Sequence, residues 1–279
     1  MNALKQQVDV WRSACADFSA LAKELSESEW QLPTDCPGWS AGDTVAHCAA
    51  VESELAGDEP LRVTIDKEAP HIKHPSGIYT ERGVVARRGR SRDQVIAEFD
   101  DAVLRRTALL EAEALDDPAG DPPITPGGIG WSWGTLLRNR PLDLWVHEQD
   151  IRRAVGRPGG LDSVAARHAQ GVFAAVLPYI IAKEAQAPPG TTVVFDVTGP
   201  LPAVYAVEVN DEGRGVAMES PPDNPTLRIT LDTESFTILG AGRRDPATLP
   251  IKIDVGADLD EVSGHELATL ILREMTVTP

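Results

Sequence analysis

The sequence predicts an α+β protein in which a helical bundle precedes a smaller α/β domain. Three observations support this prediction. With 279 residues, the chain is long enough for two ordinary domains. Before about residue 160, apolar side chains recur every three or four positions, as they do on one face of a helix. After Pro188-Pro189-Gly190, short β-branched runs alternate with Gly, Pro and Asn. We expect a bundle over residues 1–160, a connecting helix over 161–190 and an α+β domain over 191–279.

The first domain is expected to contain four long helices with a long central crossover, which is typical of a bundle. Ser40 begins one helix, because Asp43 follows three residues later in a capping-box pattern. Ser91 and Gln94 repeat this pattern at another helix. Residues 60–90 contain several prolines and glycines and are expected to be irregular. The four predicted helices cover residues 3–27, 40–57, 91–114 and 133–155.

The second domain is expected to hold an antiparallel or mixed sheet. A helical stretch after Asp162 leads into this domain and is predicted to break at Pro178. Two further helices are expected, one over 232–239 and one from 263 or 264 to 275. The predicted strands are the β-branched runs at residues 191–197, 203–209, 226–231 and 251–255.

Charge and composition exclude several classes of function. The formal net charge is −17 at pH 7, which argues against a nucleic-acid-binding protein, because such proteins present a basic surface. No run approaches eighteen apolar residues, so no membrane-spanning helix is expected. Residues 1–13 lack the apolar core of a signal peptide, and the three cysteines form no CxxC pair and no disulfide framework. We therefore expect a cytoplasmic protein with neither a nucleic-acid nor a membrane partner.

One carboxylate and two histidines form a candidate metal site. Asp143 and His147 are four residues apart on the predicted fourth helix, which places both side chains on one face. His47 lies on the second helix, and a bundle can bring it opposite this pair. Two imidazoles and one carboxylate suit Zn²⁺ and leave a fourth position for water or substrate. Spacing alone leaves a second interpretation open, in which the histidines pack in the core and Asp143 pairs with Arg140 or another arginine.

Other patterns have weaker support. Residues 130–134 match G-x-S-x-G, but a nucleophile elbow requires a preceding strand and a loop is expected here, so Ser132 is expected to cap a helix. His147-Glu148 begins like a zincin motif but lacks the second histidine. The five arginines from Arg82 to Arg92 could meet an anionic substrate or form a solvated face. Cys36 lies in a turn and is expected to pack.

Two motifs in the first domain resemble those of a known family. One is Asp35-Cys36-Pro37-Gly38-Trp39-Ser40 followed by residues 43–47, and the other runs from Asp143 to Ala154. Both are similar to signatures of the mycothiol-dependent maleylpyruvate isomerase family, whose N-terminal domain is a DinB-like four-helix bundle. Residues 191–275 are similar to the family's C-terminal domain, which has a sterol-carrier-like α/β shape. The resemblance covers nearly the whole chain and implies this two-domain fold.

The resemblance also implies the metal ligands. In the family, a divalent metal, usually zinc, is bound by a histidine on the second helix and by an acid-x-x-x-His pair on the fourth. By position these residues are His47, Asp143 and His147. The isomerases commonly have Glu where this chain has Asp143, so the effect of the shorter side chain is an open question. Asp150, one turn beyond His147, is expected either to orient an imidazole or to pair with an arginine such as Arg153.

The activity that the resemblance implies is metal-dependent thiol chemistry. Mycothiol, a sugar-linked cysteine derivative, is activated as a metal thiolate and attacks a small electrophile. The result is either a stable thioether, as in an S-transferase, or the conversion of a cis double bond into the trans isomer, as in maleylpyruvate isomerase. Arg243 in the second domain is the candidate for a catalytic, anion-binding residue, and Arg244 is a close alternative.

Two other functions stay open at this point. The first is a metal hydrolase of the wider DinB-like group, in which a metal-bound water is the nucleophile. The second is a non-catalytic binding protein on the same fold.

Overall fold

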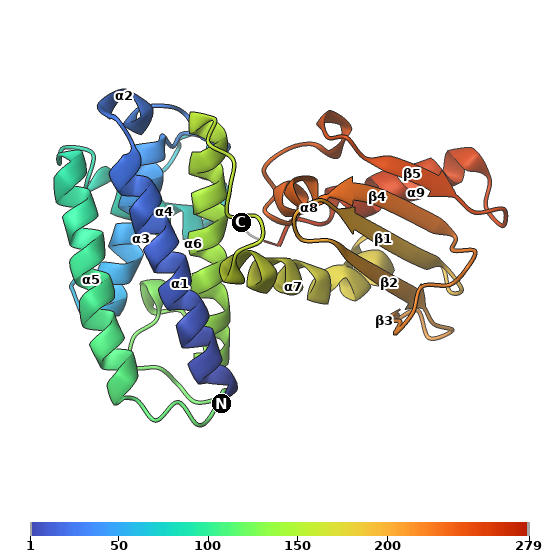
Figure 1. The fold of residues 1–279 in the computed structure, drawn as a ribbon, viewed down its shortest axis with the longest axis horizontal. Helices are drawn as coiled ribbons and strands as arrows, with labels where there is room; N and C mark the ends of the chain where they lie inside the picture. The colour runs from blue at the N-terminus through green and yellow to red at the C-terminus, as the bar shows by residue number, and fades with distance from the viewer. Residues whose placement is uncertain (1, 278–279) are drawn as a thin grey trace. The chain divides into compact units, whose positions relative to one another are not determined.

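A computed structural model describes residues 2–277 of the chain. The protein is of the α+β class and divides into two compact units between Gly160 and Leu161. The first unit is helical, and the second contains a five-stranded sheet together with helices (Figure 1). Residues 161–190, which the sequence sets apart as a connecting helix, group with the second unit.

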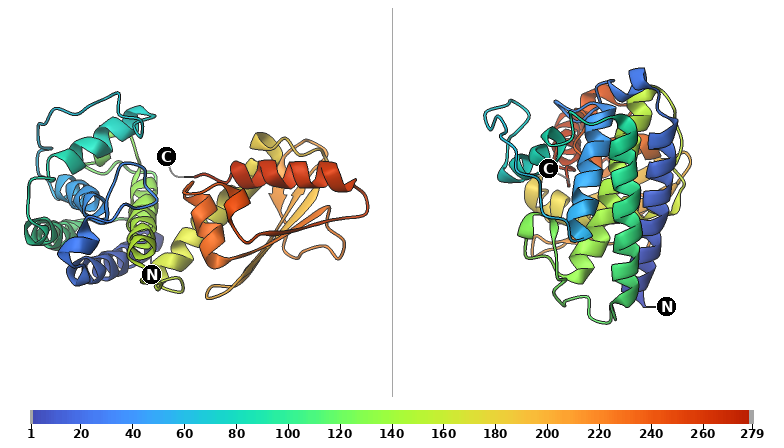
Figure 2. Two further views of the ribbon diagram at one scale, coloured as in Figure 1. Left: turned by 90° about the horizontal axis from the view of Figure 1, so that it is seen from above. Right: turned by 90° about the vertical axis from the view of Figure 1, so that its left-hand side faces the viewer.

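The helices of the first unit are α1 (Ala3–Glu24), α2 (Glu27–Trp30), α3 (Ala41–Leu55), α4 (Pro75–Val85), α5 (Arg92–Ala112) and α6 (Trp133–Val155). The four longest run side by side as a bundle (Figures 1 and 2). Within it, α1 packs against α5 and α6, and α3 packs against the same two helices. The bundle core holds large aromatic side chains that are fully buried, including Trp11, Phe18, Phe99 and Trp145. This arrangement places α3 opposite α6, the two helices that carry the predicted metal ligands.

Side-chain caps fix where two of these helices begin. The Ser40 hydroxyl accepts a hydrogen bond from the Asp43 N–H, and the Asp43 carboxylate accepts one from the Ser40 N–H, which completes a capping box. Ser91 and Gln94 form the same reciprocal pair at α5. Both starts agree with the prediction from the sequence. Helix α6 ends at Val155 and is followed by Gly156, whose φ of 66° is a backbone conformation that glycine adopts without strain.

Two parts of the first unit differ from the prediction. The first helix ends at Glu24 rather than near residue 27, because Ser26 caps the separate short helix α2. Residues 60–90 were expected to be irregular, but they contain α4. Pro75 occupies the first turn of α4, where a missing N–H is tolerated. Packing against α3 stabilises this helix, and sequence pattern alone does not show such tertiary contacts.

The second unit is built on a mixed sheet with the strand order β3-β2-β1-β4-β5. These strands are β1 (Thr192–Thr198), β2 (Ala203–Val209), β3 (Gly215–Ala217), β4 (Leu227–Asp232) and β5 (Lys252–Val255). Strand β1 pairs antiparallel with β2 and parallel with β4. The four strands predicted from the sequence are present with bounds shifted by one residue at most. Strand β3 was not predicted, because an edge strand of three residues is too short to show a periodic pattern.

Helices α7 (Val164–Tyr179), α8 (Thr233–Gly240) and α9 (Glu261–Arg273) pack against this sheet. Pro178 does not break α7. The helix continues into a π-helical turn at Ile180–Glu184, a local change of hydrogen-bond pattern that occurs in single turns next to α-helices. Within residues 2–277, Val164–Glu184 is the one helical segment whose length and composition would suit a membrane span. No such segment was expected from the sequence. Its buried face packs against β2, β3 and α8, as does that of a core helix.

Candidate metal centre

Three side chains from two helices converge in the first unit. His47 comes from α3, whereas Asp143 and His147 are one turn apart on α6. His47 Nε2 lies 3.4 Å from Asp143 Oδ2, and His147 Nε2 lies 3.6 Å from Asp143 Oδ1. One possible ligand atom from each residue lies within 4.8 Å of the others. The structure therefore brings together the three residues that the sequence pairs by spacing and by resemblance.

The donor set fits a divalent cation. Zinc sites commonly combine two imidazoles with one carboxylate and keep an open position. His47 and His147 are buried, whereas the Asp143 side chain is 33% exposed, so the centre has a protected side and an accessible side. The imidazole rings lie 4.9 Å apart between centroids. These features match a site at which a small ligand can reach a bound ion.

The two histidines differ in their electrostatic surroundings. Burial lowers the pKa of His47, and the nearby Asp143 offsets this only in part. Burial also lowers the pKa of His147, but Asp143 and a hydrogen bond to Asp150 outweigh it and raise that pKa to about 10. Burial raises the pKa of Asp143, but Arg140 and the two histidines pull it well below its usual value. Because an imidazole ligand must be neutral, a cation bound here would displace the proton of His147.

Asp143 is also connected to a buried ion-pair network. Arg140 donates to Asp143 Oδ2 at 2.8 Å and to Glu52 Oε1 at 2.8 and 3.1 Å. Glu52 has no exposed surface and also accepts from Arg106 at 2.5 Å and from the Trp11 indole at 3.2 Å. The sequence had left open the interpretation that Asp143 pairs with Arg140 instead of binding a metal. The structure contains both this pair and the convergence with the histidines.

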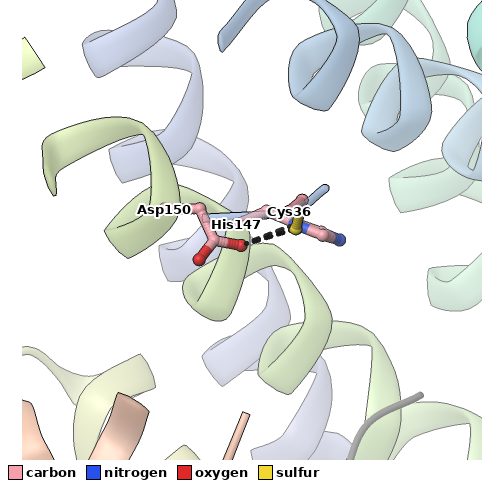
Figure 3. Close-up of side chains that lie close together, drawn as sticks. All are labelled: Cys36, His147 and Asp150. Carbon is pink, nitrogen blue, oxygen red and sulfur yellow. Dashed lines mark hydrogen bonds and ion pairs between the residues drawn. The ribbon is translucent and has the colours of Figure 1, made fainter. Parts of the chain in front are cut away.

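A second network holds His147 from its other side (Figure 3). His147 Nδ1 lies 3.1 Å from Asp150 Oδ2, and Asp150 has no exposed surface. The Cys36 thiol donates to the same oxygen at 3.2 Å, and Arg153 donates to Asp150 Oδ1 at 2.5 Å. Both contacts expected of Asp150, with an imidazole and with Arg153, are thus present. Metal-binding histidines commonly donate their other ring N–H to a carboxylate in this way.

Cys36, His147 and Asp150 also form a possible ligand group of their own. Asp150 in this group is already neutralised by Arg153. The group also needs Nδ1 of His147, which is occupied by its hydrogen bond to Asp150. We therefore assign the candidate cation site to the His47 side of His147.

Two residues near the centre were not identified from the sequence as part of it. Cys36 was expected only to pack, and Trp39 was quoted only as part of a motif. The Trp39 ring lies 5.0 Å from the His47 ring and 6.0 Å from the His147 ring between centroids. Its indole N–H donates to Glu81 at 2.8 Å. The turn that holds Cys36 and Trp39 is fixed by a bridge between Pro33 and Ser40, which the sequence does not show.

The remaining candidates have other surroundings. Ser132 is the N-cap of α6 and accepts a hydrogen bond from the Thr135 N–H, as expected. Arg243 lies in the second unit just after α8, is half-buried and donates to the Ala241 carbonyl at 2.8 Å. Its role as an anion-binding residue stays a prediction. Four of the five arginines from Arg82 to Arg92 form ion pairs.

Comparison with known proteins places this geometry in a family. A family model described as the mycothiol maleylpyruvate isomerase N-terminal domain matches residues 11–152. The chain belongs to this family. The match contains His47, Asp143 and His147, together with Cys36 and Asp150. A search of curated protein sequences finds no significant match.

Solved structures of the mycothiol maleylpyruvate isomerase family extend the likeness to both units. The crystal structure of the mycothiol-dependent maleylpyruvate isomerase aligns with a TM-score of 0.53 and 15% identity, covering 86% of this chain and 90% of that chain. A histidine-to-alanine mutant of the mycothiol-dependent maleylpyruvate isomerase aligns with a TM-score of 0.55 and 14% identity, covering 89% and 92%. At this identity the likeness is one of fold, and it agrees with the fold that the resemblance implies.

Proposed function

We propose that this protein is a metal-dependent enzyme that uses mycothiol, or a related low-molecular-weight thiol, to attack a small electrophile. The reaction is either S-transfer or a cis–trans isomerisation of the maleylpyruvate isomerase type. The observation that supports this most directly is the convergence of His47, Asp143 and His147 beside a cavity in a member of this family.

The chain's own residues would prepare the centre in advance. His47, Asp143 and His147 would hold the cation. A bound divalent cation such as Zn²⁺ favours the thiolate form of a coordinating thiol, which keeps the sulfur nucleophilic near neutral pH. Asp150 fixes the ring of His147, and Arg140 fixes the carboxylate of Asp143. The donors are therefore positioned before a ligand arrives, which lowers the entropic cost of binding.

The test is whether thiol chemistry depends on a bound metal. Protein stripped with a chelator and then reloaded with zinc is mixed with mycothiol and either chlorodinitrobenzene or maleylpyruvate. With the first electrophile, the carbon–sulfur bond forms as chloride leaves and the thiol proton passes to solvent. With the second, reversible addition of the thiol and its elimination give the trans isomer and return the thiol.

We expect about one zinc ion per chain, and turnover of one of these electrophiles only in the zinc-loaded protein. His147→Ala should lose both properties. His265→Ala makes the same substitution at an exposed position on α9 and should retain both. Turnover that persists in metal-free protein, or no zinc after reconstitution, would overturn the proposal. Thiol-independent hydrolysis by the zinc-loaded protein would favour the hydrolase alternative.

A further inference from the structure

A cavity of about 520 Å³ lies beside the candidate metal centre in the first unit. His47 forms part of its wall, residues of α3 and α4 line two sides, and residues 58–61 add to the lining. This volume falls in the range of small-molecule binding sites. A ligand in this cavity would lie next to one of the proposed metal ligands.

The run of five arginines from Arg82 to Arg92 contributes to this cavity, but most of its charge is neutralised. Glu98 binds Arg87 at 2.6 Å and Arg90 at 2.7 Å, and both arginines line the cavity. Arg88 pairs with Asp43 at 2.9 Å and with Glu81 at 3.3 Å, and Arg92 pairs with Asp93 at 3.0 Å.

Arg82 is the exception in this run. It lines the cavity from α4 and is exposed. Its guanidinium forms no hydrogen bond and no ion pair with any of residues 2–277. A guanidinium binds a carboxylate through two parallel hydrogen bonds, so an unpaired arginine in a cavity suits a carboxylate ligand. The cavity wall therefore presents a free cationic group in the same space as His47.

Carboxylates in the lining also contribute to the charge of the cavity. The lining contains three arginines and four acidic residues. Glu54 accepts a hydrogen bond from the Tyr79 hydroxyl, and Asp58 pairs with Arg105 at 2.6 Å. Glu59 is exposed and has no ion-pair partner among the described residues. Because Arg105 neutralises Asp58 from outside the lining, the three arginines balance the three remaining acidic residues, and the wall has no excess of acid that would repel a carboxylate.

We propose that this cavity binds the electrophile through a carboxylate held by Arg82. The inference rests on the proposed function for the identity of the reaction, but the binding step itself needs neither the metal nor the thiol. Arg82 would then determine specificity, because it selects electrophiles that carry a carboxylate over neutral ones.

The test compares a carboxylate electrophile with its neutral methyl ester. The probe is a chloronitrobenzoate with the chlorine ortho to the nitro group, and its methyl ester is the neutral match. Dissociation constants are measured by calorimetry on the full chain at low salt, without thiol. We expect the acid to bind about tenfold more tightly than the ester, as for a charge-assisted hydrogen-bonded pair. Arg82→Gln should remove this preference, and Arg82→Lys should restore part of it.

A matched control isolates the position of Arg82. Arg62 is also exposed and also lacks an ion pair among residues 2–277, but it does not line the cavity. Arg62→Gln removes the same charge and should bind both probes as the wild type does. Equal affinity of the wild type for acid and ester, or a preference that survives in Arg82→Gln, would overturn the proposal.

Two further ligands distinguish the alternatives. N-acetylcysteine and its methyl ester test whether the carboxylate belongs to the thiol instead. A preference that depends on Arg82 for this pair alone would overturn the assignment to the electrophile. Zinc binding and thiol turnover are measured separately, so the proposed function and this inference can fail independently.

Discussion

His147 Nδ1 lies 3.1 Å from Oδ2 of Asp150, a carboxylate with no exposed surface. Because an ionised carboxylate only accepts hydrogen bonds, the proton of this contact belongs to the imidazole. The other ring nitrogen of His147 faces Asp143 and is the one available to a cation. Asp150 thereby selects which nitrogen of His147 can act as a ligand.

Replacing Asp150 with Asn should weaken zinc binding about tenfold to a hundredfold, the usual effect of losing a partner of a metal-bound histidine. The amide keeps the shape of the side chain but loses the charge that supports His147. Zinc affinity is measured by competition with a chromophoric chelator. Asp211→Asn, at an exposed position of the second unit, is the control and should bind zinc as the wild type does. Wild-type affinity in Asp150→Asn would show that His147 needs no carboxylate partner.

Cys36→Ala should weaken zinc binding about twofold to tenfold, the usual worth of one hydrogen bond, whereas Cys36→Ser should retain the wild-type affinity. A serine hydroxyl can donate to Asp150 in place of the thiol, and a methyl group cannot. Cys15→Ala, which removes another buried thiol from α1, should leave zinc affinity unchanged. Equal affinities of the Ser and Ala variants of Cys36 would mean that its thiol only packs, as the sequence suggested.

The predictability of the centre depends on whether its residues share a helix. Asp143 and His147 are four residues apart, so helical geometry alone places them on one face. His47 required the further expectation that two helices of a bundle face each other. Cys36 gives no such signal, because it lies in a turn 111 residues before His147 in sequence and only tertiary packing brings it near. Periodicity cannot reveal a contact of this kind.

The fold shows the same division between local and tertiary signals. The helix starts at Ser40 and Ser91 were predictable because their caps involve residues three positions apart. Helix α4 was not predictable, because its proline and two glycines resemble a loop and packing on α3 stabilises it. Glu52 was not recognised as a core residue either. A charged residue is rarely fully buried unless it is paired, and the arginines that pair with it lie on two other helices.

Glu52→Gln should destabilise the first unit by about 3–5 kcal/mol, because it leaves two buried arginines without their shared carboxylate. Arg106 would lose its one acidic partner among residues 2–277, and Arg140 would keep only Asp143. Urea unfolding followed by tryptophan fluorescence measures the effect. All six tryptophans of the chain lie before residue 146, so this signal reports the first unit alone. Glu113→Gln, at an exposed position after α5, should change the free energy of unfolding by less than about 0.5 kcal/mol.

The stabilisation by Glu52 should also depend on pH. Burial raises the pKa of Glu52, but Arg106 and Arg140 outweigh it and hold the pKa below its usual value of 4.5. A carboxyl whose pKa is lower in the folded protein stabilises the fold above the unfolded pKa, and this contribution is lost as the pH falls through the folded pKa. The difference between wild type and Glu52→Gln should therefore be largest near neutral pH and shrink in acid. Urea unfolding at neutral pH and below about pH 4 checks this, and a constant difference would contradict it.

His47→Ala should abolish zinc binding without unfolding the first unit. It leaves Asp143 and His147, two donors from a single helix, which should hold zinc weakly. The cost to the fold should be about 1–3 kcal/mol, within the stability of a typical domain, and His47 Nδ1 has no hydrogen-bond partner to lose among the described residues.

If His47 were instead a packed core histidine, the reverse result would be expected, with a lower melting temperature and an unchanged zinc content. His71→Ala is the control, because it removes a histidine that pairs with Glu81 and should leave zinc stoichiometry intact. Zinc content and the melting temperature by tryptophan fluorescence, measured on the same sample, decide between the two. Unchanged zinc in His47→Ala would refute the ligand assignment and the thiol chemistry built on it.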